Sequence, residues 1–138
     1  MDVSGQVLTS WIGLWNDHAL GRFSEAVSAG YVHHAMTGRD LDLEGFRSGF
    51  RAILEAFPDM QYRIEHLVTR ADLAAAYVTS TGTHRGTYFG IVPSGQPVAF
   101  RGMYHCRIVD GRISEDWDVF DLLSPILQLG GSVRPPGD

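Results

Sequence analysis

Acidic residues stand unusually close together near the end of this 138-residue chain, in a stretch that otherwise reads as a buried strand. An ionised carboxylate loses hydration among aromatic side chains unless something compensates. Apolar surroundings also raise the pKa of a carboxyl group toward neutral pH, where it can exchange protons. The stretch therefore indicates proton-transfer chemistry. It holds Asp116, Asp118 and Asp121 among Trp117, Val119 and Phe120.

The turn before these acids decides which of them share a pocket. Two strand-like runs, 98–109 and 112–121, meet at Asp110-Gly111. A two-residue turn sets Met103 opposite Asp118, whereas a three-residue loop with a bulge and Gly111 in the left-handed region sets Tyr104 on the face of Asp118. Because a one-residue slip flips every side chain, the two registers exclude each other unless a further bulge intervenes.

The first part of the chain has the spacing of helices. We expect a helix with Ser4 as its N-cap and with Val7, Leu8, Trp11, Ile12 and Trp15 on one stripe, ending by Gly21. A second helix over about 22–28 closes at Gly30, and 31–35 is extended. Asp42 caps a third helix, whose inward stripe includes Phe46 and Phe50 and which Pro58 stops.

From Met60 the apolar period changes from about 3.6 to 2. Strands are expected at 60–69, with Tyr62, Ile64, His66 and Val68 on one face, and at 73–84, before a loop at 86–96 braced by His84. A short amphipathic closure at 122–129 precedes a flexible tail. Helices followed by a long meander predict an α+β fold: a curved antiparallel sheet capped by three N-terminal helices around a conical pocket. Residues 1–130 form one domain, and 131–138 form the tail.

Composition excludes several classes of protein. Formal net charge is −5 and the eleven basic residues are scattered singly, which argues against nucleic-acid binding. The single Cys106 cannot form an internal disulfide, so we expect a core role for it and a cytoplasmic protein. No apolar run suits a membrane span, and no signal peptide is visible. Metal-binding spacings and a phosphate loop are also missing, so neither metal nor cofactor is expected.

Several motifs, in order, resemble those of the SnoaL-like polyketide cyclases. This family is a branch of the nuclear transport factor 2-like superfamily, which also includes ketosteroid isomerase-like proteins. The resemblance implies a cone-shaped α+β barrel and cofactor-independent ring closure in antibiotic biosynthesis. It spans about 31–130 and rests on 82–86, 90–95, 107–113, Trp117-Asp118 and 127–130.

The resemblance also implies roles for particular residues. The family's acid/base aspartate on the final strand falls on Asp118, its histidine on the preceding strand falls on Tyr104, and an early asparagine falls near His33. We therefore choose the bulged register, which places Asp118 and Tyr104 in one pocket. Asp118 would then remove a proton alpha to a carbonyl in an intramolecular aldol closure, and Tyr104 and His33 would donate to the oxyanion.

The remaining pocket residues are expected from composition and position. Since neighbours in an extended segment alternate in direction, only one of His33 and His34 can enter the pocket, and we favour His33. Asp121 is more simply a cap for the following turn. The substrate is expected to be a hydrophobic small molecule. Its contacts are predicted to be Asp116, Phe120, Trp15, Phe50 and Tyr88, the helix aromatics being also core residues.

Other functions stay open on the sequence alone. The same acid could open an epoxide or isomerise a double bond, and a pocket without turnover would make the chain a ligand-binding module. Asp118 could also be a structural ion pair with Arg101 or Arg107. A convex sheet face carrying Trp117, Val119 and Ile113 predicts a homodimer.

Overall fold

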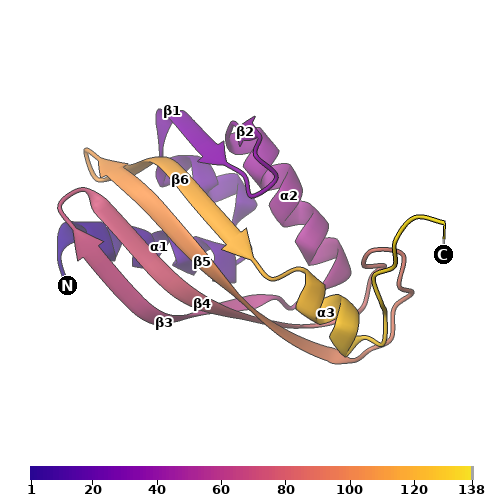
Figure 1. The fold of residues 1–138 in the computed structure, drawn as a ribbon. Coiled ribbons are helices and arrows are strands. Elements are labelled where there is room, and N and C mark those ends of the chain that lie inside the picture. The colour runs from indigo at the N-terminus through magenta and orange to yellow at the C-terminus, as the bar shows by residue number, and fades with distance from the viewer. Residues whose placement is uncertain (138) are drawn as a thin grey trace.

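The computed structural model describes residues 1–137 and has one sheet with helices against it (Figure 1). Its elements, in chain order, are α1 (Val3–Asn16), the 3-10 helix η1 (Leu20–Glu25), β1 (Val27–His34), β2 (Asp40–Leu41), α2 (Leu43–Ala56), β3 (Gln61–Arg70), β4 (Leu73–Thr83), β5 (Pro97–Val109), β6 (Arg112–Phe120) and α3 (Leu123–Gln128). Residues 131–137 follow α3 without helix or strand, and the last residue of the expected tail, Asp138, lies outside the described residues.

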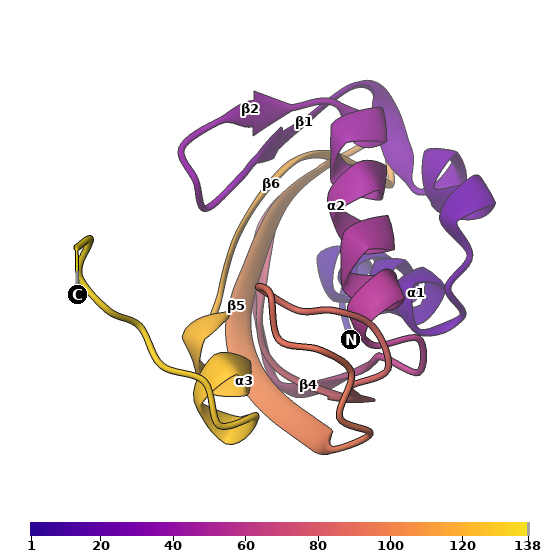
Figure 2. The ribbon, with the colours of Figure 1, turned by 90° about the vertical axis from the view of Figure 1, so that its right-hand side faces the viewer.

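The six strands form a single curved sheet in the order β2-β1-β6-β5-β4-β3. Figure 2 shows the sheet as an arc, with α1 and α2 on its concave side. The expected α+β class is therefore confirmed. The sheet is not wholly antiparallel, however, because β1 runs parallel to β6. This pairing brings the early chain beside the acid-bearing strand, which a meander alone would not do.

The start and end of α1 differ from the expected ones. Asp2, not Ser4, is the N-cap, and its Oδ1 accepts a hydrogen bond from the Gly5 backbone at 2.9 Å. Ser4 lies inside the helix, where its hydroxyl donates to the Ala71 carbonyl. The helix ends at Asn16, well before Gly21. The Asn16 side chain exchanges two hydrogen bonds with the Tyr62 backbone, which joins α1 to β3.

The expected second helix over 22–28 was wrong. The chain makes only the short 3-10 helix η1 and enters β1 at Val27, so Gly30 lies inside a strand. The reason is tertiary pairing. Val27 aligns with Ile113 of β6, and the Ile113 backbone N–H donates to the Ala26 carbonyl at 2.9 Å. Hydrogen bonds to a distant strand thus outweigh the weak local preference for helix.

Strand β3 also departs from the simple alternation. A bulge between Ile64 and His66 breaks the register with β4, so Tyr62 and Ile64 share a face but His66 and Val68 do not join them. Val68 is 66% exposed, whereas Tyr62 is buried. The expectation of one continuous apolar face was therefore wrong beyond Ile64.

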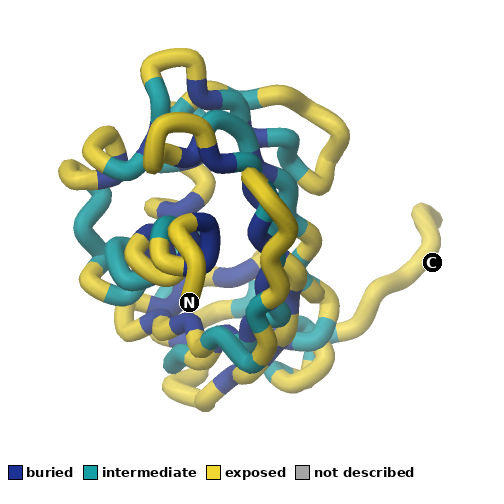
Figure 3. Tube along the Cα trace, turned by 90° about the vertical axis from the view of Figure 1, so that its left-hand side faces the viewer, coloured by how far each residue is buried: buried dark blue, intermediate teal, exposed yellow. Residues whose placement is uncertain are grey.

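The core is a cluster of aromatic rings between the helices and the concave face of the sheet. Buried segments lie inside the molecule and exposed ones at its loops (Figure 3). Trp11 is fully buried and packs edge-on against Phe23, with ring centroids 4.9 Å apart. Trp15 meets Tyr104 of β5 in the same way at 5.0 Å. Such pairs add to the large apolar area that each ring buries, so α1 is firmly fixed to the sheet.

Two local predictions near the C-terminus are confirmed. Asp121 caps the turn that leads into α3, since its Oδ1 accepts from the Ser124 backbone N–H at 3.0 Å. The buried His84 braces the loop after β4 through its own backbone and through Nδ1, which bonds to Ser94. Cys106 is fully buried, as expected for a core residue. Ile113 is also fully buried, so its predicted place on the convex face was wrong.

Candidate active site

The β5–β6 hairpin turns the critical side chains inward by a route that differs from the expected one. Its turn has two residues, Asp110 and Gly111, both with positive φ (52° and 75°) as a type I′ turn requires. The alternation of side chains between the two faces of the sheet is shifted instead within β6, where Arg107 pairs with Glu115 but Ile108 pairs with Ile113. The extra residue between them is Ser114. A bulge in the strand, rather than in the loop, therefore brings Tyr104 opposite Asp118.

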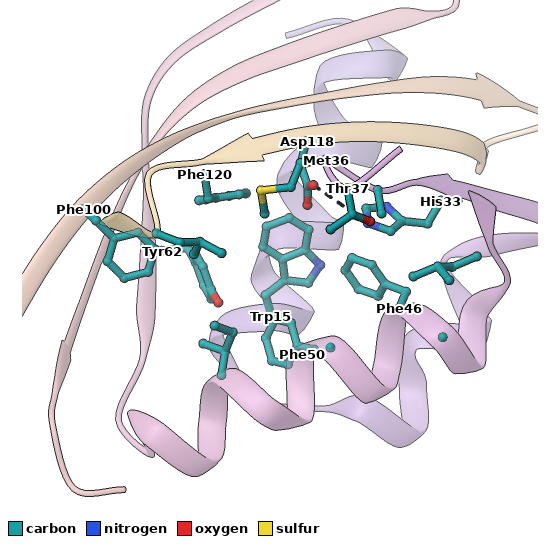
Figure 4. A pocket seen from close by; sticks show the side chains of 16 residues that line it. Trp15, His33, Met36, Thr37, Phe46, Phe50, Tyr62, Phe100, Asp118 and Phe120 are labelled. Atoms are coloured by element: carbon teal, nitrogen blue, oxygen red, sulfur yellow. Dashed lines mark ion pairs between the residues drawn. The ribbon is translucent and has the colours of Figure 1, made fainter. Parts of the chain in front are cut away.

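A cavity of about 300 Å³ opens between α2, the β1–β2 connection and the concave face of the sheet (Figure 4). Its walls are mostly apolar, which suits a hydrophobic small molecule. Figure 4 shows Asp118 and His33 meeting at one side, with the aromatic rings around them. The lining consists of Trp15, His33, Ala35, Met36, Thr37, Leu41, Gly45, Phe46, Gly49, Phe50, Ile53, Tyr62, Phe100, Asp118, Phe120 and Leu122.

Asp118 is the acid in this cavity. Its side chain is only 12% exposed, and its buried Oδ1 has no hydrogen-bond partner among the described residues. Burial raises the pKa of Asp118 to about 6; nearby His33 opposes the rise and the charge of Asp116 adds to it. An acid whose carboxyl pKa lies this close to neutrality is ionised at pH 7 yet readily accepts a proton.

Asp116 lies behind His33 as the centre of a buried hydrogen-bond network. Its carboxylate accepts from His33 Nδ1 at 2.6 Å on one oxygen. On the other oxygen it accepts from the hydroxyls of Tyr31 at 2.7 Å and Tyr104 at 2.6 Å. Asp116 is fully buried, so these donors replace the water that the carboxylate lost.

This network sets the orientation of the His33 ring. An ionised carboxylate only accepts hydrogen bonds, so Nδ1 carries a hydrogen, and Nε2 is the nitrogen left to face Asp118 at 3.8 Å. Burial by itself lowers the pKa of His33. The hydrogen bond to Asp116, then the charges of Asp116 and Asp118, outweigh burial, so that the net shift is upward. The protonated form of His33, a hydrogen-bond donor, is thus favoured beside the carboxylate of Asp118.

Five of the eight predicted site residues line the cavity: Asp118, His33, Phe120, Trp15 and Phe50. Asp116 and Tyr104 lie one layer behind it. Tyr88 lies outside it, packs on Phe57 with centroids 5.0 Å apart, and donates its hydroxyl to the Leu122 carbonyl. The predicted pocket is therefore largely assembled, but Tyr88 is a loop anchor in this structure.

Some residues of the site were not predicted. Phe46 packs on His33 with ring centroids 5.0 Å apart, and its place on the α2 stripe four residues before Phe50 was the available signal. Tyr31 was seen only as part of an extended segment. Nothing in the sequence alone shows that β1 lies beside β6, which is what brings the Tyr31 hydroxyl to Asp116.

Among the described residues Asp118 pairs with His33 at 3.8 Å and with neither Arg101 nor Arg107, so the alternative of a structural ion pair with an arginine was wrong. Arg107 pairs with Glu115 and Asp72 on the other side of the sheet. His34 likewise points outward, where it bonds to Asp40 and Glu115, so His33 is the histidine that enters the pocket. Within residues 1–137 no three His, Cys, Asp or Glu side chains gather as they would around a metal ion.

With this geometry in view, comparison with known proteins defines the class. The family described as SnoaL-like polyketide cyclase matches residues 5–129, nearly the whole chain. The chain belongs to this family.

Solved structures with the same fold support this assignment. AclR from Streptomyces galilaeus, provisionally assigned as a hydroxylase, is 26% identical with a TM-score of 0.86; the match covers 97% of this chain and 89% of AclR. IdmH from Streptomyces antibioticus, provisionally assigned as a polyketide cyclase, is also 26% identical with a TM-score of 0.86, covering 92% and 98%. TsrD from Streptomyces laurentii is 25% identical with a TM-score of 0.80, covering 96% and 99%.

A search among curated proteins and a check of the helices in residues 1–137 for membrane spans both found nothing. None of the curated proteins compared with the sequence matches it. Among the described residues, every helix is too short or too polar to cross a membrane.

Proposed function

We propose that this protein is a cofactor-independent cyclase that closes a ring in a polyketide-like substrate by an intramolecular aldol reaction. The observation that carries the proposal is the Asp118 carboxyl group, buried in an apolar cavity with an oxygen that bonds to none of the described residues. Membership of the SnoaL-like family supports the same class of substrate.

The proposed reaction moves one proton out of the substrate and back. Asp118 takes the proton from a carbon alpha to a carbonyl, and the C–H electron pair forms an enolate. The enolate carbon attacks a second carbonyl of the same molecule, a carbon–carbon bond forms, and the oxygen of that carbonyl becomes an alkoxide. Protonated Asp118 returns the proton to the alkoxide, so the enzyme ends as it began.

His33 has the complementary role in this proposal. Its Nε2 faces the same end of the cavity as Asp118 and, when protonated, would donate to the enolate oxygen as negative charge develops there. Asp116 is a positioning residue, since it holds the opposite nitrogen of the ring at 2.6 Å. Tyr104, expected as a direct donor, would instead act through Asp116, to which its hydroxyl donates.

Acid/base catalysis by Asp118 and folding of the substrate by the cavity should both contribute to the rate. A positioned acid/base contributes about 10²–10⁴-fold to the rate. Folding a flexible chain of carbonyls against the rings of the cavity removes orientational entropy and contributes as much again or more. A substrate that is already folded by fused rings would need less of the second effect and should depend mainly on Asp118.

The proposal is tested with Asp118→Asn, which keeps the shape of the side chain and removes the base. Protein is incubated with a panel of aromatic polyketones that carry an acidic methylene between carbonyls, and ring closure is followed by chromatography. Asp118→Asn should close the ring about 10²–10⁴-fold more slowly than the wild type. Asp121→Asn, in the turn before α3 and outside the cavity lining, is the matched control and should be unaffected. Equal rates for Asp118→Asn and wild type would refute the mechanism.

Oxygenation at the same carbon is a second candidate, favoured by the 26% identity over 97% of this chain to AclR, the protein provisionally assigned as a hydroxylase. The same enolate would then react with dioxygen rather than with a second carbonyl, and protonation would give a hydroperoxide. Loss of water from the hydroperoxide breaks its O–O bond and leaves a ketone, so dioxygen is the oxidant and no reductant is needed. Mass spectrometry separates the two reactions. Aldol closure leaves the mass of the substrate unchanged, whereas this oxygenation adds one oxygen atom and removes two hydrogen atoms, and the added oxygen is labelled when the reaction is run under ¹⁸O₂.

A further inference from the structure

Two buried indole groups have hydrogen-bond donors without a partner. The Nε1 atoms of Trp11 and Trp15 are both buried and bond to none of the described residues. Leaving a buried donor unpaired is unfavourable, and native proteins rarely do so without a reason. The two residues differ in one respect: Trp15 lines the cavity and Trp11 does not appear among its lining residues.

The Trp15 ring is held firmly at the cavity wall. It stands edge-on to Tyr62 at 5.3 Å and to Tyr104 at 5.0 Å, and it projects from α1, which is fixed to β3 through Asn16. Figure 4 shows the ring below Asp118, with the edge that carries its nitrogen turned toward the side of Phe46 and His33. The donor is therefore preorganised near the proposed acid/base pair.

We propose that Trp15 Nε1 donates a hydrogen bond to a neutral carbonyl oxygen of the bound ligand, and so selects ketones over hydrocarbons of the same shape. This inference rests on the proposed function and adds a third polar contact to it. Asp118 would face the alpha carbon, while His33 and Trp15 donate to carbonyl oxygens. Each contact fixes a different atom, which orients an otherwise featureless ring system.

The charges around the cavity favour a neutral acceptor. Among its lining residues the only carboxylate is that of Asp118, and neither Lys nor Arg is present. An anionic acceptor at Trp15 would therefore lie near Asp118 with only His33 to balance it. A ketone satisfies the indole N–H without bringing a second negative charge into an apolar space.

The test compares fluorenone with fluorene, two flat molecules that differ by one carbonyl oxygen. Their dissociation constants are measured by calorimetry for the wild type, Trp15→Phe and Trp11→Phe. The readout is the ratio of the two constants in each protein, because lost packing weakens both ligands alike and leaves the ratio unchanged. One neutral hydrogen bond corresponds to a preference of roughly three- to tenfold.

We expect the wild type and Trp11→Phe to prefer fluorenone by this factor, and Trp15→Phe to bind the two molecules about equally. An undiminished preference in Trp15→Phe would overturn the inference, as would failure of the wild type to bind fluorenone at its solubility limit. The same ratio in Asp118→Asn separates this inference from the proposed function. If Asp118→Asn remains active while Trp15→Phe loses the preference, the mechanism fails and the contact stands.

Discussion

Tyr104 of β5 lies directly opposite Asp118 of β6, yet its hydroxyl donates to Asp116, which precedes Asp118 by two residues on β6. Facing side chains on one side of a sheet therefore need not serve the same part of a site. Here the tyrosine, with Tyr31, holds a buried carboxylate that orients His33. Of this network only His33 lines the cavity.

Asp116 lies behind the cavity, so Asp116→Asn should slow the reaction without removing a contact to the substrate. Asp116 raises the pKa of His33 through its hydrogen bond and its charge, so its neutralisation should lower the pKa of that imidazole. The alkaline limb of the pH–rate profile should then move to lower pH, with a rate loss of about 10- to 100-fold, because a hydrogen bond to a charged group contributes about 1.5–3 kcal/mol. A lower rate with an unmoved alkaline limb would mean that Asp116 is only structural.

Asp118→Asn should stabilise the folded protein at neutral pH. Folding raises the pKa of this carboxyl from 3.8 to about 6, so the native state holds the proton more tightly than the unfolded chain. The cost of the ionised form is absent below about pH 4, grows as the pH rises to 6, and reaches at most about 3 kcal/mol above it. Urea unfolding should show the gain at pH 7.5 and little at pH 4. A variant that is less stable than the wild type at pH 7.5 would contradict the assigned burial penalty.

Gly49 should lower the stability of helix α2 and, because it has no side chain, leave space in the cavity. It lies within α2, lines the cavity, and a Cβ added there would meet nothing within 4 Å. Gly49→Ala should therefore raise stability by up to about 1 kcal/mol, whereas Gly49→Leu should fill the cavity mouth and weaken fluorenone binding. Gly13 of α1 has the same open surroundings outside the cavity lining, so Gly13→Leu is the control for binding. Equal fluorenone affinity in Gly49→Leu and Gly13→Leu would show that Gly49 does not bound the ligand.

The outer face of the sheet predicts self-association. Met103 and Val119 are paired across β5 and β6 and are 52% and 66% exposed, next to Trp117, which stacks between His34 and His105. We expect a homodimer through this face, so Val119→Asp should lower the sedimentation coefficient to that of a monomer. Val92→Asp, on an equally exposed loop, should leave it unchanged. A monomeric wild type would refute the prediction.

Much of the fold was predictable because local chemistry and tertiary structure agree. The α2 stripe with its Asp42 cap and the strands on either side of Asp110-Gly111 were visible as patterns. The failures occurred where a distant strand decided the outcome. The extended segment expected from residue 31 is the second half of β1, but its first half, from Val27, joined the strand because β6 offered hydrogen-bonding partners.

The site shows the same division. The family resemblance placed Asp118 and Tyr104 in one pocket, and the structure agrees. The register that brings them together comes from a bulge at Ser114 within β6, which no residue of the turn indicates. The position of Tyr88 depended on a loop that folds onto Phe57 and Leu122. Spacing along a strand thus predicts which side chains share a face of the sheet, whereas their hydrogen-bond partners are known only from the assembled structure.

The acid/base role depends most directly on the ionisation of Asp118, which can be measured without any substrate. The carboxyl carbon is followed by ¹³C NMR as the pH is raised from 3 to 9, and Asp118→Asn identifies its signal. We predict a midpoint near pH 6, as burial in the cavity requires. A midpoint near the ordinary value of 3.8 would show a solvated carboxylate and would contradict the proposed chemistry.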